Sequence, residues 1–262
     1  MKKKNSLIII AEAGVNHNGS FIEAKKLIDG AAKAGADYVK FQLFKAEDLA
    51  VEGTHKAKYQ KKNTKKSSNQ YNMLKSLELS EKKHIKLKEY SEKKKIKFLT
   101  SVFDVKSIKF LKKLKLDFVK IPSGEITNVP YLKEIGKFNN FTILSTGMST
   151  FQEIKFAINT LIKSGLSKKK LTVMQCNTEY PSPVKDSNLN SMISIKKKFN
   201  VSVGYSDHTL GYESAIVATA LGAKVLEKHI TLDRNQKGPD HFASLNINEF
   251  KTMVKMVRNA EL

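Results

Sequence analysis

The sequence of 262 residues predicts an α/β protein built as a (β/α)8 TIM barrel. Eight strand-like runs alternate with helical patterns along the chain, and about 250 residues is an ordinary size for one such barrel. A doubly wound open sheet is the alternative, because periodicity does not report whether a sheet closes. We therefore expect a single barrel domain over residues 1–262, with a long polar loop at about 45–80.

The predicted strands are short runs rich in β-branched and apolar residues, at 7–15, 38–44, 97–102, 118–123, 142–146, 171–176, 201–206 and 224–231. Ser20 and Glu23 form a capping-box pattern that begins the helix after the first strand. Near Gly35 this helix gives way to the second strand. Thr150 and Glu153 repeat the capping pattern before a later helix.

The longest stretch without a clear period follows the second strand and covers residues 45–80. It is polar and rich in lysine and asparagine. Loops of this length are uncommon in compact domains unless they are functional or mobile. In a barrel this loop would lie on the C-terminal face, where binding sites of the fold collect.

The formal charge of +22 first suggests a nucleic-acid partner. However, the lysines are spread through helix-like segments such as 81–95 and 106–115, with few arginines and no interleaved aromatic residues. We therefore expect no nucleic-acid binding, whereas an anionic small-molecule substrate agrees with this charge.

The cysteine content and the apolar runs bear on location. Cys176 is the single cysteine, which excludes an internal disulfide framework and suits a reducing cytoplasm. The apolar stretch at 7–10 is too short for the core of a signal peptide. No run approaches the roughly 20 apolar residues that span a bilayer. A cytoplasmic protein without membrane contact is expected.

Two histidines end neighbouring strand-like runs. His208 and His229 are 21 residues apart, with one helix-length segment between them. This spacing predicts two adjacent parallel strands with both imidazoles at the same end. Neutral imidazole is a common metal ligand, and such a pair would make an open rather than a closed site. The alternative is that both rings only bind backbone groups.

Polar residues interrupt strands that should be buried on both faces. Lys40 and Lys120 lie inside apolar runs, and Glu12, Ser206 and Glu227 lie near other strand ends. A buried lysine needs an anion, either a protein carboxylate or a bound phosphate or carboxylate. A structural ion-pair network explains any one lysine. The whole set falls at the barrel end where catalytic groups collect, which favours a binding site.

Eight motifs in order resemble the sialic acid synthase family, whose members make nine-carbon 2-keto sugar acids. The resemblance runs from about Ile8 to about Phe250. Its motifs are Ile-Ala-Glu-Ala-Gly-Val-Asn-His-Asn-Gly at 10–19, Val-Lys-Phe-Gln at 39–42, Lys-Ile-Pro-Ser-Gly-Glu at 120–125, Leu-Ser-Thr-Gly-Met at 144–148, Cys-Asn-Thr-Glu-Tyr-Pro at 176–181, Gly-Tyr-Ser-Asp-His-Thr at 204–209, Glu-Lys-His at 227–229 and Gly-Pro-Asp at 238–240.

The resemblance implies a catalytic barrel that condenses phosphoenolpyruvate with the open-chain aldehyde of an N-acetylated mannosamine-type sugar. It also implies a divalent metal, manganese or magnesium, with His208 and His229 as ligands. Glu12 and Glu125 match acidic positions near the metal and the reacting carbons, where one of them orients or deprotonates the attacking water.

The resemblance further implies a set of substrate-binding residues. The lysines and most of the serines surround phosphoenolpyruvate, whose phosphate and carboxylate call for cations and hydroxyls. The amide, tyrosine and aspartate positions face the sugar, and one asparagine in the long loop is a further sugar contact. The set is Lys40, Gln42, Asn63, Ser101, Lys120, Ser123, Ser145, Tyr180, Ser206 and Asp240.

One departure and three alternatives stay open. Members of the family usually continue into a C-terminal antifreeze-like domain that supplies an arginine to a partner subunit, whereas this sequence ends at Leu262. A homodimer is therefore only a possible assembly.

A barrel that binds phosphoenolpyruvate or a sugar acid without turnover, or only with that domain, is the alternative function. A Schiff-base aldolase using Lys40 or Lys120 is another. The acceptor is either N-acetylmannosamine or a 2,4-diacetamido-trideoxy sugar.

Overall fold

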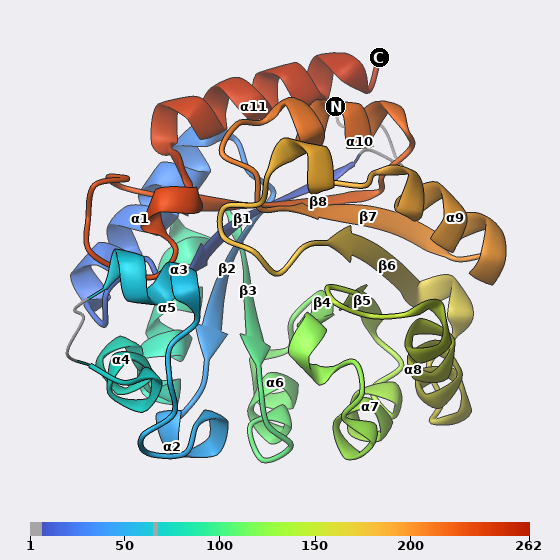
Figure 1. Ribbon diagram of the computed structural model, residues 1–262, viewed down its shortest axis with the longest axis horizontal. Coiled ribbons are helices and arrows are strands. Elements are labelled where there is room, and N and C mark those ends of the chain that lie inside the picture. Colours follow the sequence, from blue (N-terminus) through green and yellow to red (C-terminus); the bar gives the residue numbers. More distant parts are fainter. Residues whose placement is uncertain (1–6, 65–67) are drawn as a thin grey trace.

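Eight parallel strands surround a common axis in the computed structural model, which describes residues 7–64 and 68–262 (Figure 1). The barrel predicted from the sequence is confirmed, and each predicted strand lies within two residues of an observed one. The strands are β1 Ile8–Gly14, β2 Tyr38–Leu43, β3 Lys97–Val102, β4 Phe118–Ile121, β5 Phe141–Ser145, β6 Leu171–Cys176, β7 Ser202–Asp207 and β8 Val225–Thr231.

The strand ladder follows the order β3-β2-β1-β8-β7-β6-β5-β4, so neighbours in sequence are neighbours in space. β3 and β4 form the two ends of this ladder and lie beside each other, which nearly closes the ring. A two-residue strand, β9 Leu245–Asn246, adds to the end of β8. The doubly wound sheet is thereby excluded.

The register brings the predicted polar residues to one level of the barrel. Glu12 of β1 pairs with Lys40 of β2 on one side and with His229 of β8 on the other. Ser206 of β7 pairs with Glu227 of β8. Because all strands are parallel, these side chains emerge near the same C-terminal rim.

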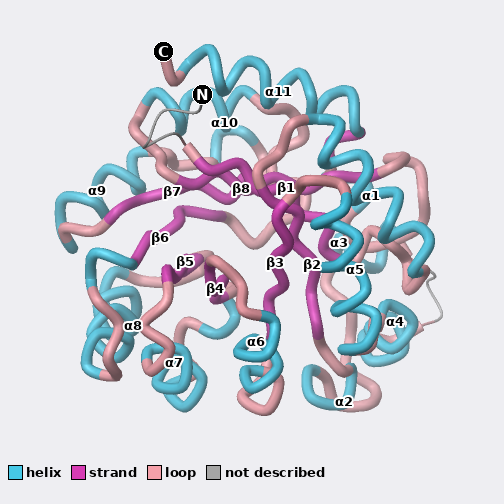
Figure 2. Tube along the Cα trace, turned by 180° about the vertical axis from the view of Figure 1, so that it is seen from behind, coloured by secondary structure: helices cyan, strands magenta, loops and turns pink. Residues whose placement is uncertain are grey.

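Helices cover the outside of the strands (Figure 2). α8 begins with a complete capping box between Thr150 and Glu153, whereas at α1 only the Ser20 side chain accepts a bond, from Glu23 N. The α-helices around the barrel are α1 Phe21–Ala34, α5 Glu81–Lys93, α6 Ile108–Leu114, α7 Val129–Gly136, α8 Phe151–Lys163, α9 Asn190–Phe199, α10 Glu213–Ala220 and α11 Ile247–Ala260; short 3-10 helices lie at Ser123–Glu125, Lys168–Lys170, Val184–Asp186 and His241–Ala243.

The two ends of the described chain are tied together. Arg258 of α11 donates to the carbonyl oxygen of Leu7 at 2.6 Å and to Asp37 Oδ2 at 2.6 Å. α11 also packs on α1, so the last helix closes the outer ring beside the first. No helix in the described part of the chain is both long and apolar enough to cross a membrane.

The segment predicted as a long polar loop contains three short helices, α2 Ala46–Leu49, α3 Lys58–Asn63 and α4 Gln70–Leu77, while residues 65–67 lie outside the described residues. Met73 and Leu77 of α4 are buried in a small satellite core with Val15 and Phe44. α4 is only eight residues long, so its buried positions repeat too few times to stand out in the sequence.

Candidate active site

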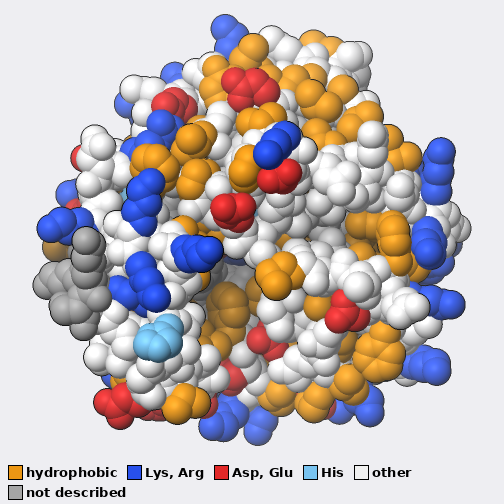
Figure 3. Space-filling view, in the orientation of Figure 1, with side chains coloured by type: hydrophobic (Ala, Val, Ile, Leu, Met, Phe, Trp, Pro, Cys, Tyr) orange, Lys and Arg blue, Asp and Glu red, His pale blue; other side chains and the backbone are white. Residues whose placement is uncertain are grey.

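A cavity of about 270 Å³ opens at the C-terminal ends of the strands. Figure 3 shows the corresponding face of the molecule, hollowed near its centre. Every strand contributes to the lining or is followed by a residue that does. Of the predicted site residues, all but Glu125 and Asn63 line this cavity, namely Glu12, Lys40, Gln42, Ser101, Lys120, Ser123, Ser145, Tyr180, Ser206, His208, His229 and Asp240.

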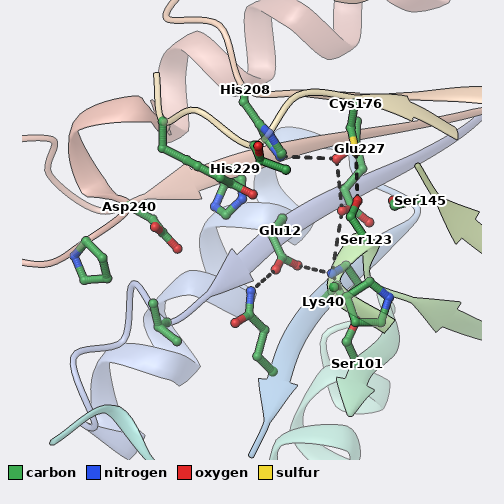
Figure 4. Close-up of a pocket in the computed structure, with 18 of the residues that line it drawn as sticks. Glu12, Lys40, Ser101, Ser123, Ser145, Cys176, His208, Glu227, His229 and Asp240 are labelled. Atoms are coloured by element: carbon green, nitrogen blue, oxygen red, sulfur yellow. Dashed lines mark hydrogen bonds and ion pairs between the residues drawn. The ribbon is translucent and has the colours of Figure 1, made fainter. Parts of the chain in front are cut away.

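Two buried lysines share two carboxylates at the floor of the cavity (Figure 4). Lys40 Nζ lies 2.9 Å from Glu12 Oε2 and 3.6 Å from Glu227 Oε1. Lys120 Nζ lies 3.3 Å from the same Glu227 oxygen. Glu12 and Glu227 therefore supply part of the negative charge that the two buried lysines need. The second carboxylate, however, is Glu227 and not Glu125.

The charges in this group shift one another's pKa. Burial raises the pKa of Glu12, against the attraction of Lys40. Burial would also raise the pKa of Glu227, but Lys120 and Lys40 outweigh it and lower that pKa to about 2. The two carboxylates raise the pKa of Lys40 despite its burial. Glu227 therefore stays ionised, while Glu12 is the stronger base of the two.

Hydroxyl groups extend the cationic floor. Lys40 Nζ donates to Ser101 Oγ at 3.3 Å, and Ser206 Oγ donates to Glu227 Oε1 at 3.3 Å. Ser123 Oγ accepts from the backbone N–H of Gly147 at 2.9 Å. Within the described residues, Ser145 Oγ is buried without a hydrogen-bond partner. Two lysines and four hydroxyl groups can donate hydrogen bonds to a bound anion here, although Glu12 and Glu227 already occupy part of this positive charge.

The two predicted histidines lie side by side at the ends of the neighbouring strands β7 and β8. The ring centroids of His208 and His229 lie 5.5 Å apart, and Tyr180 stacks on His208 at 4.1 Å. His208 Nδ1 lies 2.6 Å from the backbone oxygen of Asn177, which makes Nδ1 the donor and leaves Nε2 unprotonated. Burial lowers the pKa of His208 to about 4, and burial together with His208 lowers that of His229. Both rings are neutral at pH 7.

The histidine pair fits a divalent metal. Neutral imidazoles ligate metals, and a backbone bond that orients one ring nitrogen is the usual support of a ligating histidine. His229 Nδ1 is buried and has no partner among the described residues. No group of three or more His, Cys, Asp or Glu in residues 7–64 and 68–262 is arranged to hold a metal. A metal here would therefore take its other ligands from water or substrate.

The far end of the cavity is aromatic and acidic. Asp240 lies on the opposite side of the histidine pair from Ser145 (Figure 4). Burial, with a further contribution from Glu12, raises the pKa of Asp240 to about 7. Tyr59 of α3 lines this end and stacks on Tyr180 with centroids 5.3 Å apart.

Two predicted residues lie outside the lining. Asn63 Nδ2 donates to Pro239 O at 3.1 Å, and Asn63 O accepts from Gly238 N at 3.2 Å, so Asn63 braces the segment that carries Asp240. Glu125 is half-buried and accepts from Asn128 Nδ2 at 2.6 Å.

Several lining residues were not among the predicted site residues, and Glu227 and Tyr59 are the two that bear most on the chemistry. Glu227 was expected in the polar set at this rim, on the same strand face as His229, but no role was assigned to it. Tyr59 could not have been found, since the 45–80 segment has no clear period to place it.

Comparison with known proteins agrees with this geometry. Residues 27–262 match the NeuB family. The chain belongs to the NeuB family. The sialic acid synthase resemblance predicted from the motifs is thereby confirmed, and so is the prediction of an enzyme of this kind.

Relatives of this NeuB-family chain share its whole length. It is 49% identical to the N,N'-diacetyllegionaminic acid synthase of Campylobacter jejuni subsp. jejuni, over 97% of this chain and 76% of that protein. The enzyme of the same name from Legionella pneumophila is 47% identical, over 97% and 72%. The crystal structure of N-acetylneuraminic acid (sialic acid) synthetase from Leptospira borgpetersenii is 33% identical with a TM-score of 0.87, and the match covers 98% of this chain and 84% of that one.

Proposed function

We propose that this NeuB-family protein condenses phosphoenolpyruvate with the open-chain aldehyde of an N-acetylated mannosamine-type sugar. The products are a nine-carbon 2-keto sugar acid and phosphate. The observation that carries the proposal is the pair of buried lysines, Lys40 and Lys120, which line one cavity together with serine hydroxyls and two neutral histidines.

Phosphoenolpyruvate is the ligand that the cationic floor suits best. It carries a phosphate and a carboxylate, and each can accept several charge-assisted hydrogen bonds. Figure 4 shows four of the residues assigned to it on one side of the histidine pair, and the other two, Lys120 and Ser206, donate to Glu227 Oε1. The assigned residues are Lys40, Ser101, Lys120, Ser123, Ser145 and Ser206.

The reaction forms one carbon–carbon bond and breaks one carbon–oxygen bond. Carbon 3 of phosphoenolpyruvate attacks the aldehyde carbon, whose oxygen gains a proton. Water adds to carbon 2, and the bond from carbon 2 to the phosphate oxygen then breaks. Glu12 takes the proton from this water, because burial raises the pKa of its carboxyl group. Gln42 Nε2 donates to Glu12 Oε1 at 2.8 Å and holds this carboxyl group in place. The acid–base role rests on Glu12, since Glu125 lies outside the lining.

His208 and His229 are the residues that would hold manganese or magnesium, which when bound polarises the aldehyde oxygen. Contacts within the protein orient the histidine rings without a bound metal. The Asn177 carbonyl fixes the orientation of His208, and Tyr180 covers its face.

The acceptor sugar occupies the end of the cavity away from the lysines. Gln42, Tyr180 and Asp240 are its contacts, and Asn63 supports it through the Gly238–Pro239 backbone. The names of the two most similar synthases described above favour a 2,4-diacetamido-2,4,6-trideoxy sugar over N-acetylmannosamine. A cytoplasmic homodimer is part of the proposal, and light scattering tests the assembly.

The test is phosphate release from phosphoenolpyruvate with manganese, for each acceptor in turn and with a chelator control. Sugar-dependent release that the chelator abolishes is expected. Phosphoenolpyruvate binding without release would instead favour a barrel that only binds or that needs further chain. Borohydride trapping with pyruvate should give no adduct, because the reaction needs no Schiff base; an adduct would favour an aldolase.

A further inference from the structure

Three stacked rings connect α3 to one of the two histidines. The Tyr180 ring stacks on His208, with the ring centroids 4.1 Å apart and the ring planes 29° apart. The same ring also stacks on Tyr59 of α3, with the centroids 5.3 Å apart and the planes again 29° apart. All three side chains line the cavity. We call these three residues, Tyr59, Tyr180 and His208, the aromatic stack.

Hydrogen bonding fixes the orientation of His208 only in part. Its Nδ1 atom donates to the Asn177 carbonyl at 2.6 Å, while Nε2 lies a long 3.4 Å from Ser206 Oγ. A hydrogen bond tolerates bending of about 30° from linearity, so the ring can still tilt about the bond to Asn177. The face of Tyr180 opposes this tilt, because the two rings stack. The direction of the Nε2 lone pair therefore depends on Tyr180.

Tyr180 itself depends on its neighbours for its position. It lies between β6 and the 3-10 helix Val184–Asp186, in a stretch without helix or strand. Loop backbone holds a side chain less firmly than a strand does, so the packing around the Tyr180 ring has to fix it. Tyr59 provides part of this packing from a separate helix. A contact outside the β-strands thus bears on the histidine at the end of β7.

α3 is attached to the segment that follows β8 (Figure 1). Asn63 O accepts from Gly238 N at 3.2 Å, and Lys62 Nζ lies 5.6 Å from the centroid of the Phe242 ring. These contacts lie in the same short helix as Tyr59, which is half-buried. The Tyr59 ring therefore has a defined place from which to support Tyr180.

We propose that Tyr59 is a positioning residue for the metal site: by packing on Tyr180 it holds the His208 ring in the orientation in which Nε2 can ligate a divalent metal. The inference rests on the metal site of the proposed function and adds a residue of α3 to it. A ligand that is already oriented loses less freedom when it binds. The contribution of one aromatic pair corresponds to about 3- to 10-fold in metal affinity.

The experiment measures manganese binding to the full chain with neither substrate present, from the electron paramagnetic resonance signal of the free ion. Tyr59→Leu removes the aromatic face and should raise the Kd for manganese by about 3- to 10-fold. Tyr59→Phe keeps the ring and should bind manganese as the wild type does. Because no sugar is present, a tyrosine that served only as a sugar contact would leave the Kd unchanged.

Tyr71→Leu is the matched control. Tyr71 is another half-buried tyrosine of the 45–80 segment, on α4, and it is not among the residues that line the cavity. Its variant should keep the wild-type Kd. Tyr180→Leu tests the route by which Tyr59 acts. In that background Tyr59→Leu should have no further effect on the Kd, since the ring that connects Tyr59 to His208 is gone.

The outcomes separate this inference from the condensation, which phosphate release by the wild type tests. An unchanged Kd in Tyr59→Leu, or an equal rise in Tyr71→Leu, would overturn the role of Tyr59 and leave the condensation standing. The same effect of Tyr59→Leu with and without Tyr180 would overturn the route through that ring. No manganese binding by the wild type would overturn the metal site, and this inference with it.

Discussion

Two groups of buried lysines and carboxylates lie at the same end of the barrel and differ in function. Lys228 lies one residue before His229, and Asp207 lies one residue before His208. Lys228 Nζ is 2.9 Å from Asp207 Oδ2 and donates to the Thr209 carbonyl at 2.6 Å. Asp207 Oδ1 accepts from both the backbone and the hydroxyl of Thr209. Lys228 and Asp207 are fully buried, so they form a structural ion pair that joins β7 to β8. We call this ion pair the closed lock.

The lysines of the cavity make an open group. Lys120 approaches Glu227 no closer than 3.3 Å, and the other Glu227 oxygen has no partner among the described residues. Lys228 lies between Glu227 and His229 on the same strand, yet its side chain points to the opposite face. Both groups pair buried lysines with buried carboxylates. The two groups differ in the face of the strand on which their residues lie. Glu227 is on the face that lines the cavity, whereas Lys228 is on the opposite face and has a structural role.

Breaking the closed lock should have the largest effect. Lys228→Met leaves Asp207 charged and buried, and the loss of one partner from such a pair costs about 3–5 kcal/mol. The free energy of unfolding from urea titration measures this. Lys224→Met, at an exposed lysine just before β8, is the control and should change it little. A loss below about 1 kcal/mol would contradict the assignment of a lock.

Removing a cation from the open group should instead affect turnover. Lys120→Met should lower kcat/KM for phosphoenolpyruvate by about 100- to 1,000-fold, because a positioned charge at the reacting anion is lost. The unfolding free energy should fall less than in Lys228→Met, since Lys40 still neutralises Glu227. Lys109→Met, at an exposed lysine of α6, is the control. A variant with full activity but a large loss of stability would show that Lys120 is structural.

The comparison extends to buried histidines outside the cavity. Burial, together with His84 and Lys83, lowers the pKa of His17 to about 3. Below about pH 6.5 the His17 ring therefore binds a proton in the unfolded chain but not in the folded chain. The share of the stability that comes from His17 should be fully present above pH 6.5 and fall by about 2 kcal/mol on going to pH 5, in addition to the shares of the other buried histidines. Urea titrations with a chelator present measure this slope. His17→Gln should reduce this slope by about the share of one histidine, and an unchanged slope would show that His17 does not contribute to it.

The smallest effect is expected at the brace of the sugar end. Asn63→Ala removes the hydrogen bond that the side-chain amide donates to the Pro239 carbonyl, and one such hydrogen bond contributes about 1 kcal/mol. The KM for the acceptor should rise by about fivefold, while the KM for phosphoenolpyruvate stays the same. Steady-state kinetics with each substrate varied separates the two. Asn72→Ala, at an exposed position of α4, serves as control. Equal rises in both KM values would show that Asn63 acts on the whole cavity.

The sequence by itself determined the strands, the end of the barrel that carries the site and the family. Buried strands read as apolar runs, and alternation assigns each polar residue to a face, so Glu12, Lys40 and Lys120 were expected at one rim. These features are local, and short windows of sequence contain them. The motifs add the family, because their order along the chain is also a property of the sequence alone.

Only the tertiary structure decided which residues meet. Glu227 and not Glu125 neutralises Lys120, since β8 faces β4 across the barrel and no pattern in the chain reports that distance. Closure depended on β3 and β4 lying side by side. The burial of Met73 and Leu77 was decided in the same way, because it occurs only where α4 meets Val15 and Phe44. Pairing across the barrel and burial by a distant segment are global properties, so local periodicity does not encode them.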